Sequence, residues 1–363
     1  MFKAAKTVDF LFLTYYTDGS KQRKRLSSLI RLYFPLYLSR RSVSFSALRT
    51  ERPINFLCRR RAAEWMIVME KFDSLIIGEV AQDTNVDFDG TVVQAVGGAV
   101  YYSGCAAANM GHKIAVLPKA DLSQLDVTAA FHEKAPSISV FPLNSPHSFV
   151  TKNVYHTADR ERRTSTVDSL IAPYTTDEVP VDQIDAAIWH LAGLAGGDIP
   201  NEMIPFAAKH AMVAIDVQTM LRWVENGGMV YHDWKEKKEL LPYIRFLKTD
   251  AAEAEILTGL TDRAEAAKLL YSWGAKEVLI THNTEVLAYD GQRIYTCPIK
   301  ARNLSGRTGR GDTTFAGYIT ERQRAGVEEA LRYCTALVSL KMETPGPFQG
   351  TRQDVLDYLR EFY

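Results

Sequence analysis

The chain has 363 residues, with 43 Lys and Arg against 43 Asp and Glu, and 46% of it is hydrophobic. These values are typical of a soluble globular protein that is long enough for one large α/β domain or two smaller ones. The sequence contains no run of about eighteen apolar residues, which excludes an ordinary transmembrane helix. Its four cysteines form no CxxC pair. This excludes the common zinc spacings and indicates reduced thiols in a cytoplasmic protein.

Residues 1–68 differ in composition from the rest of the chain. They contain fourteen Lys and Arg but only four Asp and Glu, with basic clusters at 21–25 and 59–61. A targeting presequence, a basic arm for nucleic acid or membrane surfaces, and a non-native extension upstream of a start at Met66 or Met69 all fit this composition. We interpret the segment as a disordered or non-native extension, because a complete α/β pattern begins directly after it.

The first half of that pattern begins with an apolar run at 73–78 (DSLIIG), which ends in glycine as buried strands often do. The motif that follows is GEVAQD rather than GxGxxG, which argues against a nicotinamide-dependent dehydrogenase. Polar and apolar residues then alternate over 86–96 around Asp89–Gly90, which predicts a hairpin. The other elements predicted in this half are a helix over 99–110, a strand over 114–117 and β-like runs over 137–143 and 148–155.

The second half continues the alternation of strands and helices. The predicted strands are 186–191, 212–217, the end of 240–248, 277–281, 286–289 and 293–297, and the predicted helices are 199–210, 250–257, 264–274 and two after residue 312. Such βαβ alternation predicts an α/β fold with a doubly wound, mostly parallel sheet that carries helices on both faces. We therefore expect one domain over 69–363, with a small β flap formed by residues near 84–97 and 137–155.

The stretch NLSGRTGRGDTTFAG, residues 303–317, has the strongest chemical character in the chain. Gly309 and Gly311 bracket Arg310, Asp312 follows, and helical spacing of apolar residues begins there. A glycine turn at a helix N-terminus presents backbone N–H groups to an anion, and the helix dipole adds to the attraction. With a carboxylate beside it, this arrangement suits phosphoryl transfer to a hydroxyl. An ordinary loop with Asp312 as a helix N-cap remains the alternative.

Two other clusters fall at predicted strand or helix ends. Asp83 follows the first strand and precedes the glycine pair Gly97–Gly98, and Asp250 with Glu253 begins a helix. Taken alone, Asp83 is equally a turn residue, and Asp250 with Glu253 is nearly a capping box. In a doubly wound sheet, however, ligands bind beyond the carboxyl ends of the strands. We therefore expect the three clusters to meet at one edge.

The order of these motifs resembles the PfkB, or ribokinase-like, family of carbohydrate kinases. A GxxxxD motif after the first strand, a helix led by GG, the segment KTDAAEAEILTG (248–259) and the late TGRGD turn occur in the sequence that this family shows. The segments AIDVQTMLR (214–222) and SLKMETPGPF (339–348) are most similar to the branch that includes myo-inositol kinases. The resemblance spans residues 72–348 and implies a ribokinase-like fold with a small β lid.

The resemblance also implies roles for individual residues. Asp312 would be the general base, and the backbone of Gly309, Arg310 and Gly311 would form the anion hole. Asp250 and Glu253 would lie near Mg²⁺, directly or through water. The residues that would bind the substrate are Asp83, Gly97, Gly98 and Gln218, and those that would bind ATP are Thr281, His282, Thr308, Gly309 and Gly311. Arg310 stands where the family usually has alanine, and Tyr102 stands where it usually has asparagine.

The implied activity is phosphorylation of a hydroxyl on a small polyol or sugar, with ATP and Mg²⁺ as cofactors and myo-inositol as the best guess for the substrate. We expect no nucleic-acid partner and no membrane partner, and a monomer or a homodimer. A kinase for another sugar or a nucleoside is one alternative. The other is a catalytically silent, ligand-sensing protein on the same fold, because a fold does not determine a function.

Overall fold

The computed structural model describes residues 70–157 and 163–363. The basic segment over 1–68 lies outside these residues, so its predicted character is not addressed by the structure. No helix within the described ranges is long and apolar enough to cross a membrane.

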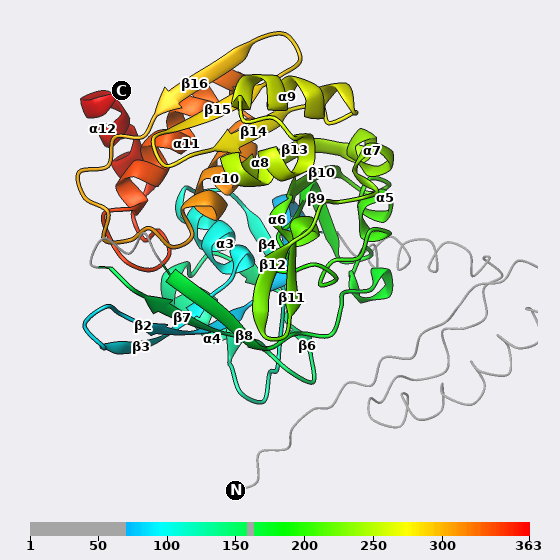
Figure 1. Cartoon of the computed structure of the whole chain (residues 1–363), viewed down its shortest axis with the longest axis vertical. Coiled ribbons are helices and arrows are strands. Elements are labelled where there is room, and N and C mark those ends of the chain that lie inside the picture. Colours follow the sequence, from blue (N-terminus) through cyan, green and yellow to red (C-terminus); the bar gives the residue numbers. More distant parts are fainter. Residues whose placement is uncertain (1–69, 158–162) are drawn as a thin grey trace, which may run out of the picture. The chain divides into compact units, whose positions relative to one another are not determined.

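A large sheet forms the centre of the fold (Figure 1). Its strands run in the order β16-β15-β14-β13-β10-β9-β1-β4-β5, with β6 also paired to β4. All neighbouring strands from β14 to β5 pair in parallel, and so does β6 with β4. The hairpin β15–β16 adds antiparallel strands at the other edge. The strands are β1 (Glu70–Glu79), β4 (Ile114–Ala120), β5 (Ser139–Val140), β6 (Leu143–Asn144), β9 (Ile184–Leu191), β10 (Met212–Asp216), β13 (Ile244–Asp250), β14 (Val278–Thr281), β15 (Glu285–Tyr289) and β16 (Ile294–Pro298). The predicted doubly wound, mostly parallel sheet is confirmed.

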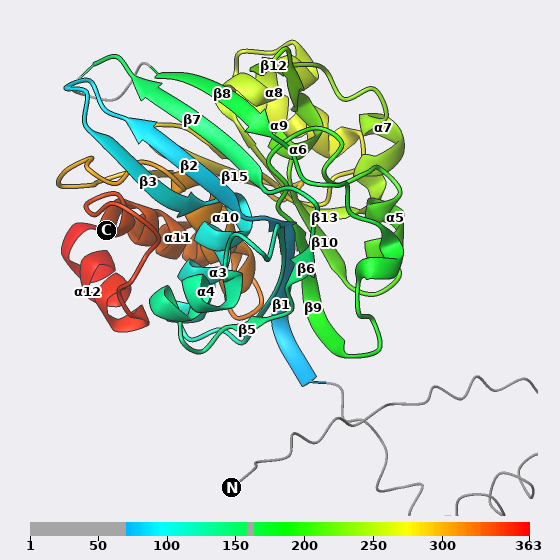
Figure 2. The same ribbon diagram turned by 90° about the horizontal axis from the view of Figure 1, so that it is seen from below.

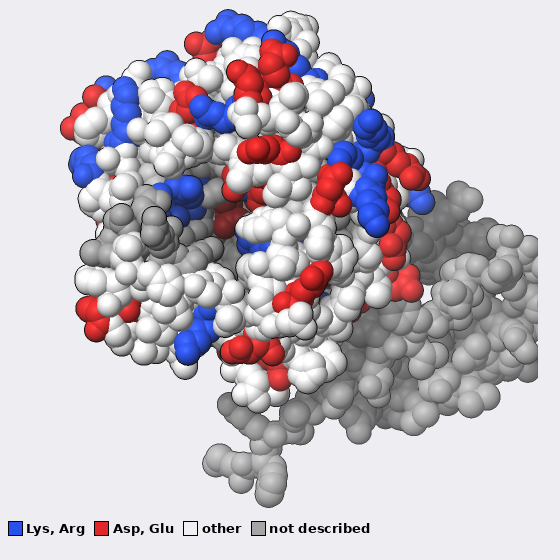
Figure 3. All heavy atoms as spheres, in the orientation of Figure 1, with Lys and Arg blue, Asp and Glu red and all other residues white. Residues whose placement is uncertain are grey.

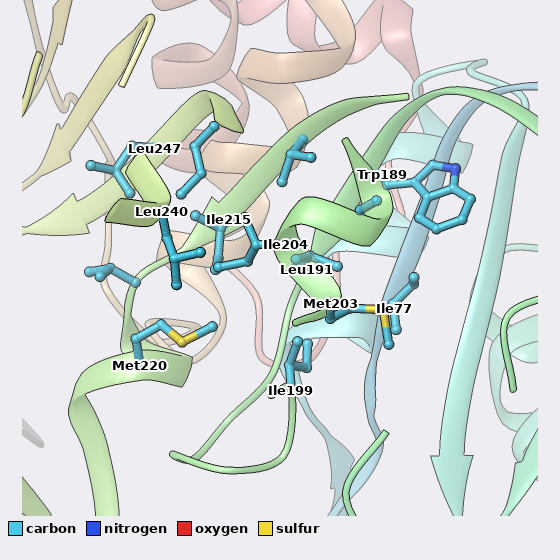
Figure 4. Close-up of a cluster of buried hydrophobic side chains, with 14 of the residues drawn as sticks. Ile77, Trp189, Leu191, Ile199, Met203, Ile204, Ile215, Met220, Leu240 and Leu247 are labelled. Atoms are coloured by element: carbon cyan, nitrogen blue, oxygen red, sulfur yellow. The ribbon is translucent and has the colours of Figure 1, made fainter. Parts of the chain in front are cut away.

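Helices cover both faces of this sheet, because successive side chains of a strand point to opposite faces. In β1, Leu75 and Ile77 pack into one hydrophobic cluster, whereas Ile76 packs into another on the opposite side. Figure 4 shows part of the first cluster, in which Trp189 and Leu191 lie near Met203 and Ile204. On that side lie α5 (Met203–Ala207), α6 (Gln218–Leu221), α7 (Lys237–Leu240), α8 (Ala251–Thr258) and α9 (Arg263–Ser272). On the other side lie α3 (Ala99–Asn109), α4 (Val127–Lys134), α10 (Arg310–Glu321) and α11 (Val327–Lys341), with α12 (Arg352–Phe362) packed on α3 and α11.

A second, six-stranded sheet stands beside one end of the large sheet (Figure 2). Its order is β11-β12-β8-β7-β2-β3, and the β2–β7 pair alone among its neighbours is parallel. The strands are β2 (Ala81–Val86), β3 (Val92–Gly97), β7 (Phe149–Tyr155), β8 (Arg163–Ser169), β11 (Arg222–Glu225) and β12 (Gly228–Tyr231). Because β2 continues almost directly from β1, the chain passes from one sheet to the other at Val80.

Several elements differ from the sequence-based prediction. Residues 139–144, assigned to the flap, pair with β4 in the large sheet instead, so only 149–155 of the range 137–155 joins the small sheet. The helix predicted over 199–210 is reduced to α5, and the prediction missed α4, α12 and the hairpin β11–β12. Gly326 stands where the sequence would favour the C-terminus of the helix that begins near Asp312. It is instead the N-cap of α11, and α10 ends earlier, at Glu321, without a glycine.

Candidate active site

A cleft of about 650 Å³ lies between the carboxyl ends of the large-sheet strands and the inner face of the small sheet. Figure 3 shows the molecule hollowed near the middle of this face, with acidic and basic side chains at the hollow. The cleft is lined by all three clusters that the sequence singled out, around Asp83, Asp250 and Asp312. The expected convergence at one edge of the sheet is therefore present in the structure.

The turn before α10 forms one wall of the cleft. Gly309 is the N-cap of α10 with φ 75°, a left-handed conformation that glycine adopts without strain. A side chain here would also collide with the Tyr102 ring, because a Cβ atom at Gly309 would lie 2.1 Å from Tyr102 Cδ1. Asp312 lies in the first turn of α10, whose first N–H groups have no intrahelical acceptor. The wall therefore combines the N–H groups of a helix N-terminus with a carboxylate.

Asp83 lies on β2, at the opposite side of the cleft. Its Oδ1 atom accepts a hydrogen bond of 2.5 Å from Thr151 Oγ1 on β7. Its Oδ2 atom lies against Gly97, where a Cβ atom would come within 2.3 Å of it. Gly98 has φ 106° and would bring a Cβ atom to 2.4 Å from the carbonyl oxygen of Glu79. The glycine pair thus makes room for the Asp83 carboxylate and for the backbone where the two sheets meet.

The small sheet presents a polar face to the cleft. Alternate residues of β2 and β7 point the same way, so Asn85 and Asn153 line the cleft beyond Asp83 and Thr151. Asn153 Nδ2 donates to Asn85 Oδ1 at 3.2 Å, and Ser165 Oγ donates to Asn153 Oδ1 at 2.6 Å. Such a face, made of carboxylate, amide and hydroxyl groups, suits a ligand that carries several hydroxyls.

A buried group of charges lies below the turn. Lys248 Nζ is 2.8 Å from Asp216 Oδ2 and 3.9 Å from Glu253 Oε2, and all three side chains are buried. The same ammonium would lie 3.3 Å from a Cβ atom at Gly311, so its charge is adjacent to the turn. Burial alone would lower the pKa of Lys248, but the charges of Asp216 and Glu253 outweigh it and raise the pKa. Lys248 therefore stays cationic beside the turn that precedes α10.

Asp312 lies near three cationic side chains, those of Lys248, Arg222 and Lys341. Burial raises the pKa of the Asp312 carboxyl, and the positive charges of Lys248, Arg222 and Lys341 oppose that rise. A carboxylate with a raised pKa is a better proton acceptor near neutral pH than an exposed aspartate. Tyr102 on α3 also lines the cleft. Burial raises the pKa of its phenol, and the charges of Asp83 and Asp312 raise it further.

Asp250 and Glu253 form the capping box of α8. Asp250 Oδ1 accepts from Glu253 N at 2.8 Å, and Glu253 Oε2 accepts from Asp250 N at 2.8 Å. Burial raises the pKa of Glu253 to about 7, against the opposing charge of Lys248. The described residues contain no cluster of three or more candidate metal ligands. Two carboxylates without a cage are nevertheless what Mg²⁺ uses when substrate phosphates and waters complete its shell.

Of the other predicted site residues, most line the cleft but His282 does not. Thr281, at the end of β14, and Thr308 line the cleft, as do Arg310 and Gln218. The Gln218 amide donates to the carbonyl oxygen of Gly193 at 3.3 Å, so it also supports the loop after β9. His282 is not among the residues that line the cleft, and its Nδ1 is 2.8 Å from Thr284 Oγ1 in the turn after β14.

Sequence reasoning missed residues that reach the site through long-range contacts. The sequence marks Lys248 only as the start of the motif over 248–259, and it indicates no role for Thr151, Asn153 or Lys341. The period-two pattern of 148–155 could have indicated which of its side chains face inward once its pairing with β2 was known. No local signal marks Lys341, which is distant in sequence from the turn that it contacts.

Similarity to known proteins identifies this chain as a kinase, an enzyme that transfers a phosphoryl group, and shows its family. Residues 148–352, more than half of the chain, match the pfkB family carbohydrate kinases, and the chain belongs to this family. A cytidine kinase from Thermococcus kodakarensis is 24% identical over 280 residues, which cover 72% of this chain and 92% of that protein.

Solved structures agree with this assignment. A pyrophosphate-dependent kinase of the ribokinase family, complexed with a pyrophosphate analogue and myo-inositol, is 30% identical with a TM-score of 0.71, covering 78% of this chain and 99% of that one. A pyrophosphate-dependent myo-inositol-1 kinase, converted by two substitutions into a myo-inositol-3 kinase, is 29% identical with a TM-score of 0.70, covering 79% and 98%. Ribokinase of Arabidopsis thaliana, complexed with ribose and ATP, shares the fold at 18% identity and a TM-score of 0.64, covering 80% and 99%.

Proposed function

We propose that this kinase phosphorylates a hydroxyl of a small polyol, with myo-inositol as the acceptor. The observation that carries the proposal is that Asp83, on the small sheet, and Asp312, in the first turn of α10, line the same cleft. The acceptor would lie between them, with its hydroxyls against Asp83, Gly97, Gly98 and Gln218. The polar face formed by Asn85 and Asn153 supports a ligand with many hydroxyls rather than an apolar one.

In the transfer step, Asp312 accepts the proton of the attacking hydroxyl. The hydroxyl oxygen forms a bond to the terminal phosphorus of the donor, and the bond from that phosphorus to the bridging oxygen breaks. Backbone N–H groups of Gly309, Arg310, Gly311 and Asp312 stabilise the negative charge on the transferred group. Mg²⁺, where bound near Asp250 and Glu253, would neutralise charge on the donor phosphates.

The donor has two candidates. ATP follows from the family resemblance, with Thr281 and Thr308 on the donor side of the cleft. Pyrophosphate is favoured by the relatives of 29–31% identity, which are pyrophosphate-dependent. Cations beside the turn, including Lys248 and Arg310, would suit either diphosphate group.

The test is a matrix of donors and acceptors. Purified protein with Mg²⁺ is given ATP or pyrophosphate together with myo-inositol, ribose, fructose or a nucleoside, and the phosphorylated product is followed by ³¹P NMR. We expect the highest kcat/KM with myo-inositol. Activity confined to cytidine or another nucleoside would contradict the acceptor while sparing the family, and the cytidine kinase relative makes that outcome worth including. Absence of product from every pair would favour a ligand-sensing protein.

A further inference from the structure

Lys341, the last residue of α11, is a buried cation whose hydrogen bonds go to backbone. Its side chain is 1% exposed. The Nζ atom donates to the carbonyl oxygen of Gly306 at 2.5 Å and to the carbonyl oxygen of Thr308. It also lies over the face of the Tyr102 ring, 5.2 Å from the centroid. Carbonyl oxygens and the face of an aromatic ring are both favourable neighbours for a cation.

These contacts bear on the geometry of the catalytic turn. A trans peptide is planar, and its C=O and N–H bonds point in opposite directions. Fixing the carbonyls of Gly306 and Thr308 toward Lys341 therefore directs the N–H groups of Arg307 and Gly309 away from it. Gly309 is the N-cap of α10, so its peptide orientation sets where the N–H groups of the turn begin.

We infer that Lys341 is a positioning residue for phosphoryl transfer: its ammonium is a built-in cation that ties the Gly306 and Thr308 carbonyls together and holds the Gly309–Asp312 turn ready for the donor phosphate. This role rests on the proposed function, because it assigns that turn to the donor. Lys341 does not touch the reacting atoms. It acts through the backbone that does.

Lys341 loses its proton in a pH range that binding and stability measurements can cover. Burial lowers its pKa to about 8, although the charge of Asp312 opposes the shift. Tyr102, the other titratable side chain that faces Lys341, stays neutral over this pH range because burial raises the pKa of its phenol. The lowered pKa means that protonated Lys341 opposes folding below pH 8, and that this penalty fades as pH rises toward the unfolded value of about 10.4. The free energy of unfolding should therefore rise between pH 8 and about pH 10.4, whereas donor binding should weaken over the same range.

The test compares Lys341→Met and Lys341→Ala with wild type and with Lys119→Met. Lys119 is a matched control, since it is 2% exposed, donates to the Pro173 carbonyl and to Glu178, and lies 4.9 Å from the Tyr174 ring centroid. Binding of pyrophosphate and, separately, of ADP is measured calorimetrically in tetramethylammonium buffer, whose cation is too large for the cavity. Kinetics with the best donor and acceptor pair follow, with potassium, ammonium or methylammonium added.

We expect both Lys341 variants to bind the two probes about tenfold more weakly and to lose about 10- to 100-fold in kcat, with little change in acceptor KM. Small cations should restore the Ala variant, because its cavity is open. They should not restore the Met variant, whose side chain fills that space. Lys119→Met should bind both probes like wild type, and the fall in binding above pH 8 should disappear in Lys341→Met.

Wild-type binding and turnover in Lys341→Met would overturn the inference. So would a loss in Lys341→Ala that none of the three cations restores, or an equal loss in Lys119→Met, because each indicates a merely structural lysine. Probe binding requires no acceptor. A failed acceptor screen would therefore count against the proposed function alone, whereas wild-type protein that binds neither probe would contradict both.

Discussion

Thr151 Oγ1 donates a 2.5 Å hydrogen bond to Asp83 Oδ1, across the register pair that joins β7 to β2. The second oxygen of the same carboxylate lies against Gly97. Asp83 is therefore held on both sides, so under the proposed function less ordering is needed when the substrate binds.

Replacing Thr151 by Val should loosen this carboxylate. Valine keeps the shape but removes the donor, and a hydrogen bond to a charged group contributes about 1.5–3 kcal/mol. We expect acceptor KM to rise by about tenfold or more, with a smaller change in kcat and no change in donor KM. Steady-state kinetics at saturating donor would measure this. Thr84→Val is the control, since Thr84 follows Asp83 on β2 and its side chain points to the other face. Equal effects from the two variants would contradict a role for the Thr151 hydrogen bond.

Asp312→Asn should separate catalysis from folding. The variant cannot accept the hydroxyl proton, so we expect kcat to fall by about 10²–10⁴ while donor binding persists. Burial raises the pKa of Asp312, which means that its charged form opposes folding near neutral pH. The free energy of unfolding of the Asn variant should thus equal or exceed that of wild type. Product formation and chemical denaturation measure the two effects, with the exposed Glu329→Gln as a control. A kcat near the wild-type value would rule out Asp312 as the base.

Comparing Gly309 with Gly259 tests the close packing of Tyr102 against Gly309. Both have φ 75°, but a Cβ atom at Gly259 would meet nothing within 4 Å, whereas one at Gly309 would collide with Tyr102. Gly259→Ala should cost only the left-handed strain, about 1–2 kcal/mol of unfolding free energy, and keep its activity. Gly309→Ala should cost more and lose activity, because the turn or the ring must move. Equal losses of stability and full activity in both variants would contradict this packing.

The parts predictable from sequence are those whose cause is local. The capping box of Asp250 and Glu253 is encoded by their three-residue spacing, and the start of α10 by Gly309 and the residues after it. The position of Asp83 at the cleft is predictable because Asp83 follows a strand with a clear apolar pattern. By contrast, Lys341 becomes part of the site only because α11 returns to the turn before α10. The two short strands β5 and β6 have no pattern long enough to show which sheet they join.

The missed helix α12 is tied to the core by a charge cluster that predicts a pH dependence. Glu321 on α10 accepts hydrogen bonds from Arg352 of α12, one of them at 3.0 Å, and lies 3.1 Å from His112 Nε2. Burial alone would raise the pKa of Glu321, but these hydrogen bonds outweigh it and lower the pKa to about 2. Because the folded pKa lies below the unfolded value of about 4.3, the ionised carboxylate stabilises the fold above that value. This contribution is lost as pH falls toward 2.

We therefore expect Glu321→Gln to lower the free energy of unfolding by about 1–3 kcal/mol at pH 7 and by much less near pH 2.5. Urea denaturation of both proteins across this range measures the difference. Glu328→Gln is the control, because Glu328 pairs with Arg293 while both side chains are more than half exposed. Such a pair contributes at most about 1 kcal/mol, and its loss should barely register. If the stability difference between wild type and Glu321→Gln were the same at pH 7 and pH 2.5, the carboxylate would not be held by Arg352 and His112, and α12 would depend on its apolar contacts alone.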